Sequence, residues 1–283
     1  MARTTGPDRR VGAPAVGLRP LCAILLLCFV LPLAAAAERV VSLAPSLTES
    51  MLELQAGDRL VGVLDGGERP AALASLPSLG RWGRLEMETL LALRPDLILL
   101  WPDSISAAQR EQLRSFGIPV FEAQPRRLED IAAQLEALGG RVGRAERGRE
   151  LAAQLRRQLD ELRRQYRREA PLRVFYQVWD RPLYSIGGPQ IISDALRVCG
   201  AVNLFADLDL PAPQLSVEAV LARDPEVILV SQPEQRDAWQ AWPQLQAVRR
   251  GQVWAVPDRG LERPSPQMLA ATRKLCELLH RVP

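Results

Sequence analysis

The clearest pattern of apolar and polar positions lies near the middle of the chain. Apolar residues recur there at spacings of three and four, with arginines and acids between them, which places them on one face of an α-helix. These apolar positions are Leu151, Leu155, Leu159, Leu162 and Tyr166. Because Pro171 follows the pattern, we predict one long amphipathic helix over residues 142–166 that ends before this proline.

One segment appears on both sides of this helix in the same register. Residues 88–99 and 218–229 both begin with Glu and have Leu-Ala three and four residues later. Pro follows at the seventh position, an acid at the eighth, and then an apolar run typical of a buried strand. From this repeat we predict two similar lobes joined by the long helix. Two unrelated copies of a common helix–proline–strand turn are the alternative.

Short apolar runs alternate with helical patterns in both lobes, which predicts an α/β fold with mainly parallel sheets. The predicted strands are residues 39–45, 60–64, 97–100, 119–121, 173–178, 227–230 and 253–256. In the first lobe, Ser46 and Glu49 resemble a capping box that starts a helix. A later helix at 128–138 is expected to end at the break formed by Gly139 and Gly140.

The expected architecture is therefore two similar lobes with mainly parallel sheets, joined by one long helix, with a ligand cleft between the lobes. We place the N-terminal lobe at residues 38–125, the linking helical segment at 126–170 and the C-terminal lobe at 171–283.

Residues 1–37 are predicted to be a secretory signal peptide. Arginines precede an apolar run at residues 21–33, and alanines at 34–37 supply the small residues needed for cleavage. The run is short for a membrane-spanning helix, although an uncleaved anchor is the alternative. The rest of the chain is expected to be exported.

Removal of this leader changes the charge of the chain. It contains four of the 36 basic residues and one of the 33 acidic residues, so basic and acidic residues balance in the remainder. A balanced domain lacks the basic surface that nucleic acids require. We therefore expect no nucleic-acid partner.

Two cysteines remain once the leader, with Cys22 and Cys28, is removed. Cysteines in an exported chain more often pair than stay free. We predict a disulfide between Cys199 and Cys276 that ties the segment after residues 194–198 to the C-terminal helix. No CxxC arrangement for redox or zinc chemistry is present.

The sequence contains no recognisable catalytic constellation. The single histidine, His280, lies three residues from the C-terminus, and Ser185-Ile-Gly-Gly188 lacks the strand–GxGxxG–helix context of a nucleotide site. We therefore expect no enzyme, no metal site and no resident cofactor. An exported carboxylate hydrolase is the alternative, and it predicts two acids that face one another in the cleft.

Aromatic residues, glycines and prolines concentrate in loops that follow strands. Trp82, Trp179, Tyr184 and the loop 258–263 are of this kind. Parallel sheets bind ligands at the carboxyl ends of their strands, and exposed rings in a cleft suit a large, partly apolar ligand. The alternative for each of these three rings is an ordinary place in the core of its lobe.

Several motifs point to a known family. They are Arg-Val-Val-Ser-Leu-Ala-Pro-Ser-Leu-Thr-Glu at 39–49, Trp82 followed by Glu-Thr-Leu-Leu-Ala-Leu-Arg-Pro-Asp at 88–96, Val-Cys-Gly-Ala-Val-Asn-Leu-Phe at 198–205, Pro-Gln-Leu-Ser-Val-Glu at 213–218 and Glu-Arg-Pro-Ser-Pro at 262–266. With them, residues 38–282 resemble the ABC-importer substrate-binding proteins that lack a flexible hinge. The Trp82, Cys199 and Glu-Arg-x-Ser-Pro matches are most similar to the cobalamin-binding members.

The resemblance implies a monomeric periplasmic receptor that captures cobalamin or a related corrinoid and delivers it to the transmembrane subunits of an ABC importer. It also implies that Glu88 and Glu218 dock on the permease, one from each lobe. From sequence alone, an acid in the first turn of a helix is equally favoured by the helix dipole. The implied ligand contacts are Trp82, Tyr184, Gly66, Asp258, Arg259, Gly260, Leu261, Glu262 and Arg263.

Some positions depart from the family pattern. Gly66, Ala212, Gly260 and Leu261 stand where the family has ligand-contacting or aromatic residues. The same fold binding a ferric siderophore, haem or another corrinoid is therefore the alternative. The arginines that would suit an anionic siderophore are Arg81, Arg181, Arg259 and Arg263.

Overall fold

A computed structural model describes Gly6 and residues 36–66, 69–81, 83–102 and 104–282. The chain divides into two units, Met1–Ala35 and Ala36–Pro283, and the fold below is that of the second. The predicted signal peptide lies almost entirely outside the described residues, as does Trp82. Within the described part of the chain, no helix is both long and apolar enough to cross a membrane.

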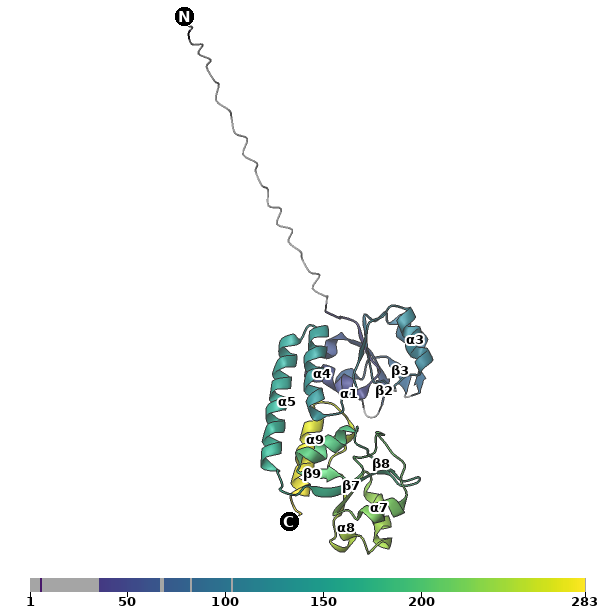
Figure 1. Ribbon diagram of the computed structural model, residues 1–283. Coiled ribbons are helices and arrows are strands. Elements are labelled where there is room, and N and C mark those ends of the chain that lie inside the picture. Colours follow the sequence, from purple (N-terminus) through teal and green to yellow (C-terminus); the bar gives the residue numbers. More distant parts are fainter. Residues whose placement is uncertain (1–5, 7–35, 67–68, 82, 103, 283) are drawn as a thin grey trace, which may run out of the picture. The chain divides into compact units, whose positions relative to one another are not determined.

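The first lobe contains a six-stranded sheet with the strand order β4-β3-β2-β1-β5-β6 (Figure 1). Neighbouring strands run parallel except β3 and β4, which form a hairpin. The strands are β1 (Val40–Ser42), β2 (Leu60–Asp65), β3 (Ser78–Arg81), β4 (Arg84–Leu85), β5 (Leu97–Leu100) and β6 (Val120–Glu122). The helices are α1 (Pro45–Glu53), α2 (Met87–Ala92) and α3 (Ala107–Ser115).

The second lobe contains a five-stranded sheet with the order β11-β10-β7-β8, in which β9 also pairs with β7. All pairs are parallel except β7 with β8. The strands are β7 (Leu172–Trp179), β8 (Tyr184–Ser185), β9 (Ala201–Asn203), β10 (Val227–Val230) and β11 (Val253–Ala255). The helices are α6 (Ile191–Val198), α7 (Val217–Arg223), α8 (Gln246–Arg249) and α9 (Met268–Leu279).

The predicted α/β fold with two lobes and mainly parallel sheets is confirmed. The four additional strands β3, β4, β8 and β9 were not predicted. Each has two to four residues, which is too short for the alternation of apolar and polar positions to identify a strand.

The sequence repeat corresponds to the same structural unit in each lobe, α2 with β5 and α7 with β10. In both units a residue with positive φ precedes the proline, Arg94 at 44° and Asp224 at 41°. The side chain of the acid after each proline then accepts a hydrogen bond from a backbone N–H at the start of the adjacent strand, β1 in the first lobe and β7 in the second. Asp96 bonds Arg39 N at 3.0 Å, and Glu226 bonds Arg173 N at 2.9 Å. The repeat therefore preserves both the turn and its link to the adjacent strand.

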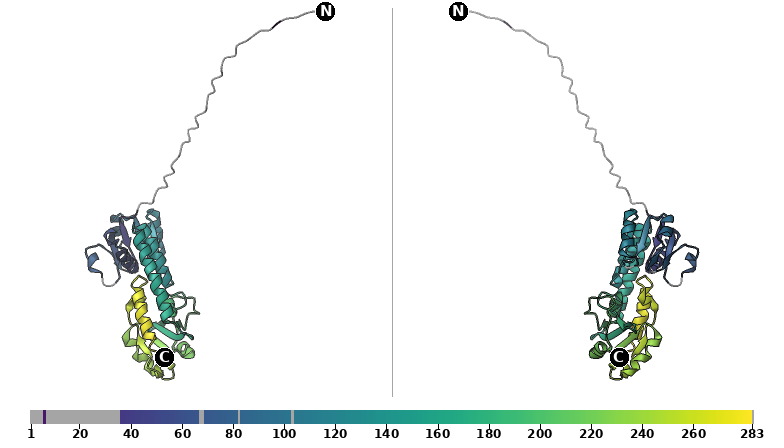
Figure 2. Two further views of the ribbon diagram at one scale, coloured as in Figure 1. Left: turned by 90° about the vertical axis from the view of Figure 1, so that its left-hand side faces the viewer. Right: turned by 90° about the vertical axis from the view of Figure 1, so that its right-hand side faces the viewer.

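Helices α4 (Leu128–Arg141) and α5 (Ala145–Gln165) lie side by side and connect the two lobes (Figures 1 and 2). The predicted long helix thus begins at Ala145, three residues later than expected. The predicted break at Gly139-Gly140 is wrong, because both glycines continue α4 and the chain turns at Gly143, whose φ is 64°.

The glycines of α4 and α5 serve close helix packing. A Cβ atom on Gly148 would lie 2.6 Å from the Leu135 carbonyl oxygen, and one on Gly139 would lie 3.2 Å from the Gly148 Cα. Glycine therefore lets the two backbones approach here. A helix-breaking glycine and a packing glycine look alike in sequence, which explains the error.

The predicted capping box of α1 is also wrong. The helix begins at Pro45, its N-cap is Ala44, and no side chain caps it. Proline fits the first helical position because its φ is already helical and its missing N–H needs no partner there. Ser46 and Glu49 consequently lie inside the helix, and both are buried.

One apolar core continues from the first lobe through the helices into the second. It contains residues from α1, α4, α5, α6 and α9, which pack into a single buried cluster. Representative members with at most 1% exposed surface are Met51, Leu135, Leu159, Leu196 and Leu275. The lobes are therefore joined by shared buried surface as well as by the chain.

The predicted disulfide between Cys199 and Cys276 is confirmed. It joins the C-terminal end of α6 to α9, and both cysteines are buried. Because α6 and α9 belong to the shared core, the bond holds together two of the helices that line the junction of the lobes.

Replacing both cysteines, in Cys199→Ala/Cys276→Ala, should lower the free energy of unfolding. The bonded residues are 77 positions apart, and a cross-link over such a loop stabilises by about 4 kcal/mol through the entropy of the unfolded chain. Urea denaturation measures the difference, and reduced wild-type protein should match the variant. Equal stability of the oxidised wild type and the variant would contradict this role.

Gly148→Ala should lower the free energy of unfolding by about 1–3 kcal/mol, because its methyl group would push α5 away from α4. Gly140→Ala is the matched control, since nothing lies within 4 Å of a Cβ atom there. The control should gain up to about 1 kcal/mol from the better helix propensity of alanine. A stabilising effect of both substitutions in urea denaturation would exclude the proposed close contact.

Candidate functional site

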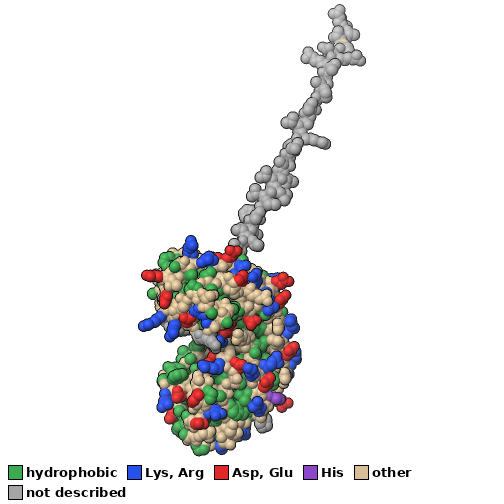
Figure 3. All heavy atoms as spheres, turned by 180° about the vertical axis from the view of Figure 1, so that it is seen from behind, with side chains coloured by type: hydrophobic (Ala, Val, Ile, Leu, Met, Phe, Trp, Pro, Cys, Tyr) green, Lys and Arg blue, Asp and Glu red, His purple; other side chains and the backbone are tan. Residues whose placement is uncertain are grey.

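Three adjoining cavities form one cleft between the lobes, near the carboxyl ends of β2, β7 and β10. Their volumes are about 280, 660 and 340 Å³. The first two share Gly66, Arg263 and Gln267, and the last two share Arg259 and Glu262. Figure 3 shows the molecule hollowed between the lobes. The cleft lies where parallel sheets bind ligands, as the sequence predicts.

The wall formed by the first lobe combines apolar side chains with one ion pair. Arg69 pairs with Asp65 at the end of β2, and the Ser78 hydroxyl donates a hydrogen bond of 2.6 Å to the same carboxylate. These contacts, Ser78 first, hold the pKa of Asp65 below its usual range. Asp65 is therefore ionised at neutral pH, and Arg69 does not present an uncompensated charge.

Gly66 lies in the cleft wall, as the resemblance implies, and its lack of a side chain has a local cause. A Cβ atom on Gly66 would lie 2.4 Å from the Pro45 Cγ. Pro45 is the first residue of α1 and lines the same cavity. Pro45 therefore fills space that a side chain at position 66 would need.

The loop at 258–263 is organised by Asp258. Its carboxylate accepts hydrogen bonds from the Lys274 ammonium at 2.6 Å and from the Gly260 N–H at 2.8 Å. These two contacts, Lys274 first, lower the pKa of Asp258. The loop presents Arg259, Glu262 and Arg263 to the cleft.

Leu261 faces the other way in this loop. It has no exposed surface and belongs to the shared apolar core. The Leu261 side chain therefore has no accessible surface with which to contact a ligand, although the resemblance implies such a contact. Burial of Leu261 instead fixes the loop on the core, which leaves the flanking polar residues in the cleft.

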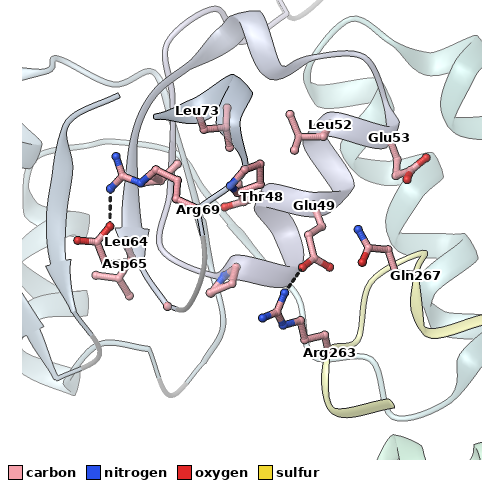
Figure 4. A pocket seen from close by; sticks show the side chains of 14 residues that line it. Thr48, Glu49, Leu52, Glu53, Leu64, Asp65, Arg69, Leu73, Arg263 and Gln267 are labelled. Carbon is pink, nitrogen blue, oxygen red and sulfur yellow. Dashed lines mark hydrogen bonds and ion pairs between the residues drawn. The ribbon is translucent and has the colours of Figure 1, made fainter. Parts of the chain in front are cut away.

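Glu49 and Arg263 form an ion pair across the cleft (Figure 4). Glu49 lies on α1 of the first lobe, and Arg263 lies in the loop of the second lobe. The Glu49 Oε1 accepts a hydrogen bond of 2.8 Å from the Arg263 Nη1. Sequence reasoning missed this role because Glu49 fitted a capping pattern, and the two residues are 214 positions apart.

The wall formed by the second lobe carries an exposed ring. Trp179 at the end of β7 is 53% exposed and lines the third cavity together with Val178 and Ile192. Beneath them, the hydroxyls of Tyr176 and Ser231 are buried close to each other, and neither makes a well-aligned hydrogen bond to a described residue. Burial raises the pKa of Tyr176, with a smaller contribution from Glu262, so its phenol stays neutral.

Tyr184 lies close to this wall but is not among the residues that line the three cavities. It begins β8, it is half-buried, and its hydroxyl lies 3.5 Å from the Gln214 Oε1. The position predicted for Trp82 cannot be compared in the same way, because that residue lies outside the described ones.

Each arginine that lines the cleft is paired with an acid. The pairs are Arg69 with Asp65, Arg259 with Glu262 and Arg263 with Glu49. Among the described residues, no group of three or more His, Cys, Asp or Glu side chains is arranged to hold a metal ion.

Glu88 and Glu218 occupy equivalent exposed positions on the two lobes, in the first turns of α2 and α7. The backbone N–H of Glu218 itself and then the Ser216 hydroxyl lower the pKa of the Glu218 carboxyl. Ser216 also caps α7 by accepting the Ala219 N–H at 3.3 Å. Both acids are therefore available at the surface, where the helix dipole also favours them.

A family model described as periplasmic binding protein matches residues 40–259. The vitamin B12-binding protein of Vibrio cholerae is 35% identical over 246 residues, which cover 86% of this chain and 89% of that protein. The vitamin B12-binding protein of Yersinia pseudotuberculosis is 36% identical over 274 residues, covering 95% of this chain and 96% of that protein.

Solved structures give the same result. The periplasmic vitamin B12 binding protein BtuF of Vibrio cholerae has a TM-score of 0.78 at 35% identity and covers 86% of this chain and 97% of its own. The periplasmic haem binding protein HutB of Vibrio cholerae has a TM-score of 0.74 at 23% identity, with 87% and 99% covered, and shares the fold. On the family match and on these relatives, the chain belongs to the periplasmic binding protein family.

Proposed function

We propose that this chain captures cobalamin in the periplasm and delivers it to the transmembrane subunits of an ABC importer. The observation that carries this proposal is a charge-balanced cleft with an exposed tryptophan, in a chain about one-third identical to proteins named vitamin B12-binding protein. Cyanocobalamin is a large ligand without net charge whose ring is bordered by amides. Such a ligand needs apolar area and hydrogen bonds rather than unpaired charges.

The charge balance favours cobalamin over an anionic siderophore or haem. A carboxylate-bearing ligand binds best to arginines whose donors are free, and the cleft arginines Arg69 and Arg263 already donate hydrogen bonds to Asp65 and Glu49. Arg259 is 4.0 Å from Glu262, which balances its charge without a hydrogen bond. Of the other two arginines considered from sequence, Arg181 pairs with Asp180 at 3.4 Å. Arg81 is exposed at the end of β3 and does not line the three cavities.

The proposed ligand contacts come from both lobes. Trp179 supplies an exposed ring at the second lobe, which compensates in part for the absence of rings at Gly66 and Gly260. Trp82 and Tyr184 remain proposed contacts on the basis of the resemblance. The polar members of the proposed set are Asp258, Arg259, Glu262 and Arg263.

We place the two lobes at residues 38–125 and 171–283. The lobes are proposed to move little relative to each other when the ligand binds. The shared core and the close packing of α4 on α5 oppose a large hinge motion, because separating the lobes would expose buried apolar surface. We propose a monomeric receptor without enzymatic activity and without a resident cofactor.

Release is proposed to follow docking on the importer through Glu88 and Glu218. Two like charges at equivalent places on two similar lobes suit a membrane partner built with two-fold symmetry. Such contacts between exposed charges steer association and weaken as salt rises.

Purified protein beginning at Glu38 should bind cyanocobalamin with one-to-one stoichiometry and a Kd of about 1 μM or tighter. Burial of the corrin ring against apolar side chains should give a negative heat-capacity change. Isothermal titration calorimetry at several temperatures measures both quantities. Failure to bind cyanocobalamin together with tight binding of haem or of an anionic ferric siderophore would overturn the assignment.

Charge reversal in Glu88→Lys/Glu218→Lys should reduce cellular uptake of labelled cyanocobalamin at least about tenfold and leave its Kd within about twofold. The matched control reverses two other exposed acids, in Glu161→Lys/Glu234→Lys, which changes the net charge equally. Uptake by the control should stay near wild type. Equal loss of uptake in both variants would point to overall charge, and loss of binding would remove the docking role.

A further inference from the structure

Several buried polar atoms without a well-aligned hydrogen-bond partner among the described residues lie around the cleft. They are the Glu49 Oε2, the Tyr176 hydroxyl and the Ser231 hydroxyl, each on a residue that lines one of the cavities. Buried polar groups in proteins are nearly always bonded. These atoms are themselves buried, so they lie behind the cleft wall, and the Tyr176 hydroxyl lies near both Ser231 and Glu262.

Glu49 differs from the other two because it carries a full charge. The Glu49 side chain is 9% exposed and lines the first cavity among apolar neighbours that include Pro45 and Leu52. Its Oε1 is bonded to Arg263, whereas its Oε2 has no partner within the described part of the chain. Because water screens a buried charge less, the charge of Glu49 has a stronger electrostatic interaction with nearby groups than an exposed charge would have.

Arg263 is the other half of this arrangement. Its side chain is 47% exposed and lines both the first and the second cavity. A free guanidinium in this position would bind a carboxylate through two parallel hydrogen bonds. The ion pair with Glu49 occupies part of this donor set and cancels its charge.

We propose that Glu49 is the residue that makes the cleft select uncharged amide groups over carboxylates. Its carboxylate neutralises Arg263 and places a largely buried negative charge beside the cleft, which repels an anionic group. Discrimination thus includes a repulsive element. The choice of cobalamin as the preferred ligand rests on the function proposed above, whereas the rejection of carboxylates does not.

A purely structural role for Glu49 makes a different prediction. If the ion pair only tied the two lobes together, its loss would lower stability and weaken the binding of all ligands alike. A specificity role changes the ratio of affinities between uncharged and carboxylated ligands. The ratio therefore separates the two roles even in a destabilised protein.

The test compares wild type with Glu49→Gln, which keeps the size of the side chain and removes its charge. Glu161→Gln is the matched control, because Glu161 is exposed on α5 and does not line the three cavities. Calorimetric titrations would use cyanocobalamin, its monocarboxylic acid derivatives with one peripheral amide hydrolysed, and haem as a separate ligand that carries carboxylates.

Glu49→Gln should improve the affinity for haem, and for at least one monocarboxylic acid relative to cyanocobalamin, by about tenfold or more. Glu161→Gln should leave these ratios within about twofold of wild type. Unchanged ratios in Glu49→Gln would overturn the inference while leaving cobalamin capture intact. If wild type failed to bind cyanocobalamin, the proposed function would fall, and the haem titrations of the two variants would still decide whether Glu49 excludes carboxylates.

Discussion

The packing of α4 against α5 is the constraint on which the remaining arrangement depends. Gly139 and Gly148 let the two backbones come within contact distance, and the paired helices then provide one apolar surface for both lobes. Through this surface a single core runs from α1 to α9. Because each lobe buries part of its apolar surface on the same helices, the cleft between them has walls whose spacing is set by the core.

The loop at 258–263 connects the shared core to the binding surface, so the core also fixes the position of this loop. Leu261 is buried in the shared core, Asp258 is held by Lys274 on α9, and Arg263 reaches Glu49 on α1. The loop is thus attached to both lobes at once. Its polar side chains are paired before any ligand arrives, which limits the conformational entropy lost on binding and gives the cleft a balanced charge.

Much of the fold could be predicted from the chain alone. The β/α alternation, the repeat at Glu88 and Glu218, and the pairing of Cys199 with Cys276 depend on patterns that neighbouring residues or the exported setting impose. The errors have a common origin. Glycines at 139 and 140 suggested a helix end, and Glu49 suggested a helix cap, because local rules describe what a residue can do without a tertiary partner.

The sequence by itself determined most of the helices and strands, the two-lobed α/β class and the family, since these follow from hydrophobic periodicity and from motifs of adjacent residues. Only the tertiary structure decided which side chains meet in the cleft. Glu49 and Arg263 lie 214 positions apart, and Trp179 is exposed at a strand end where a core position was the alternative. Such pairings depend on how helices and loops pack in three dimensions. The spacing of residues along the chain does not show which distant residues come into contact.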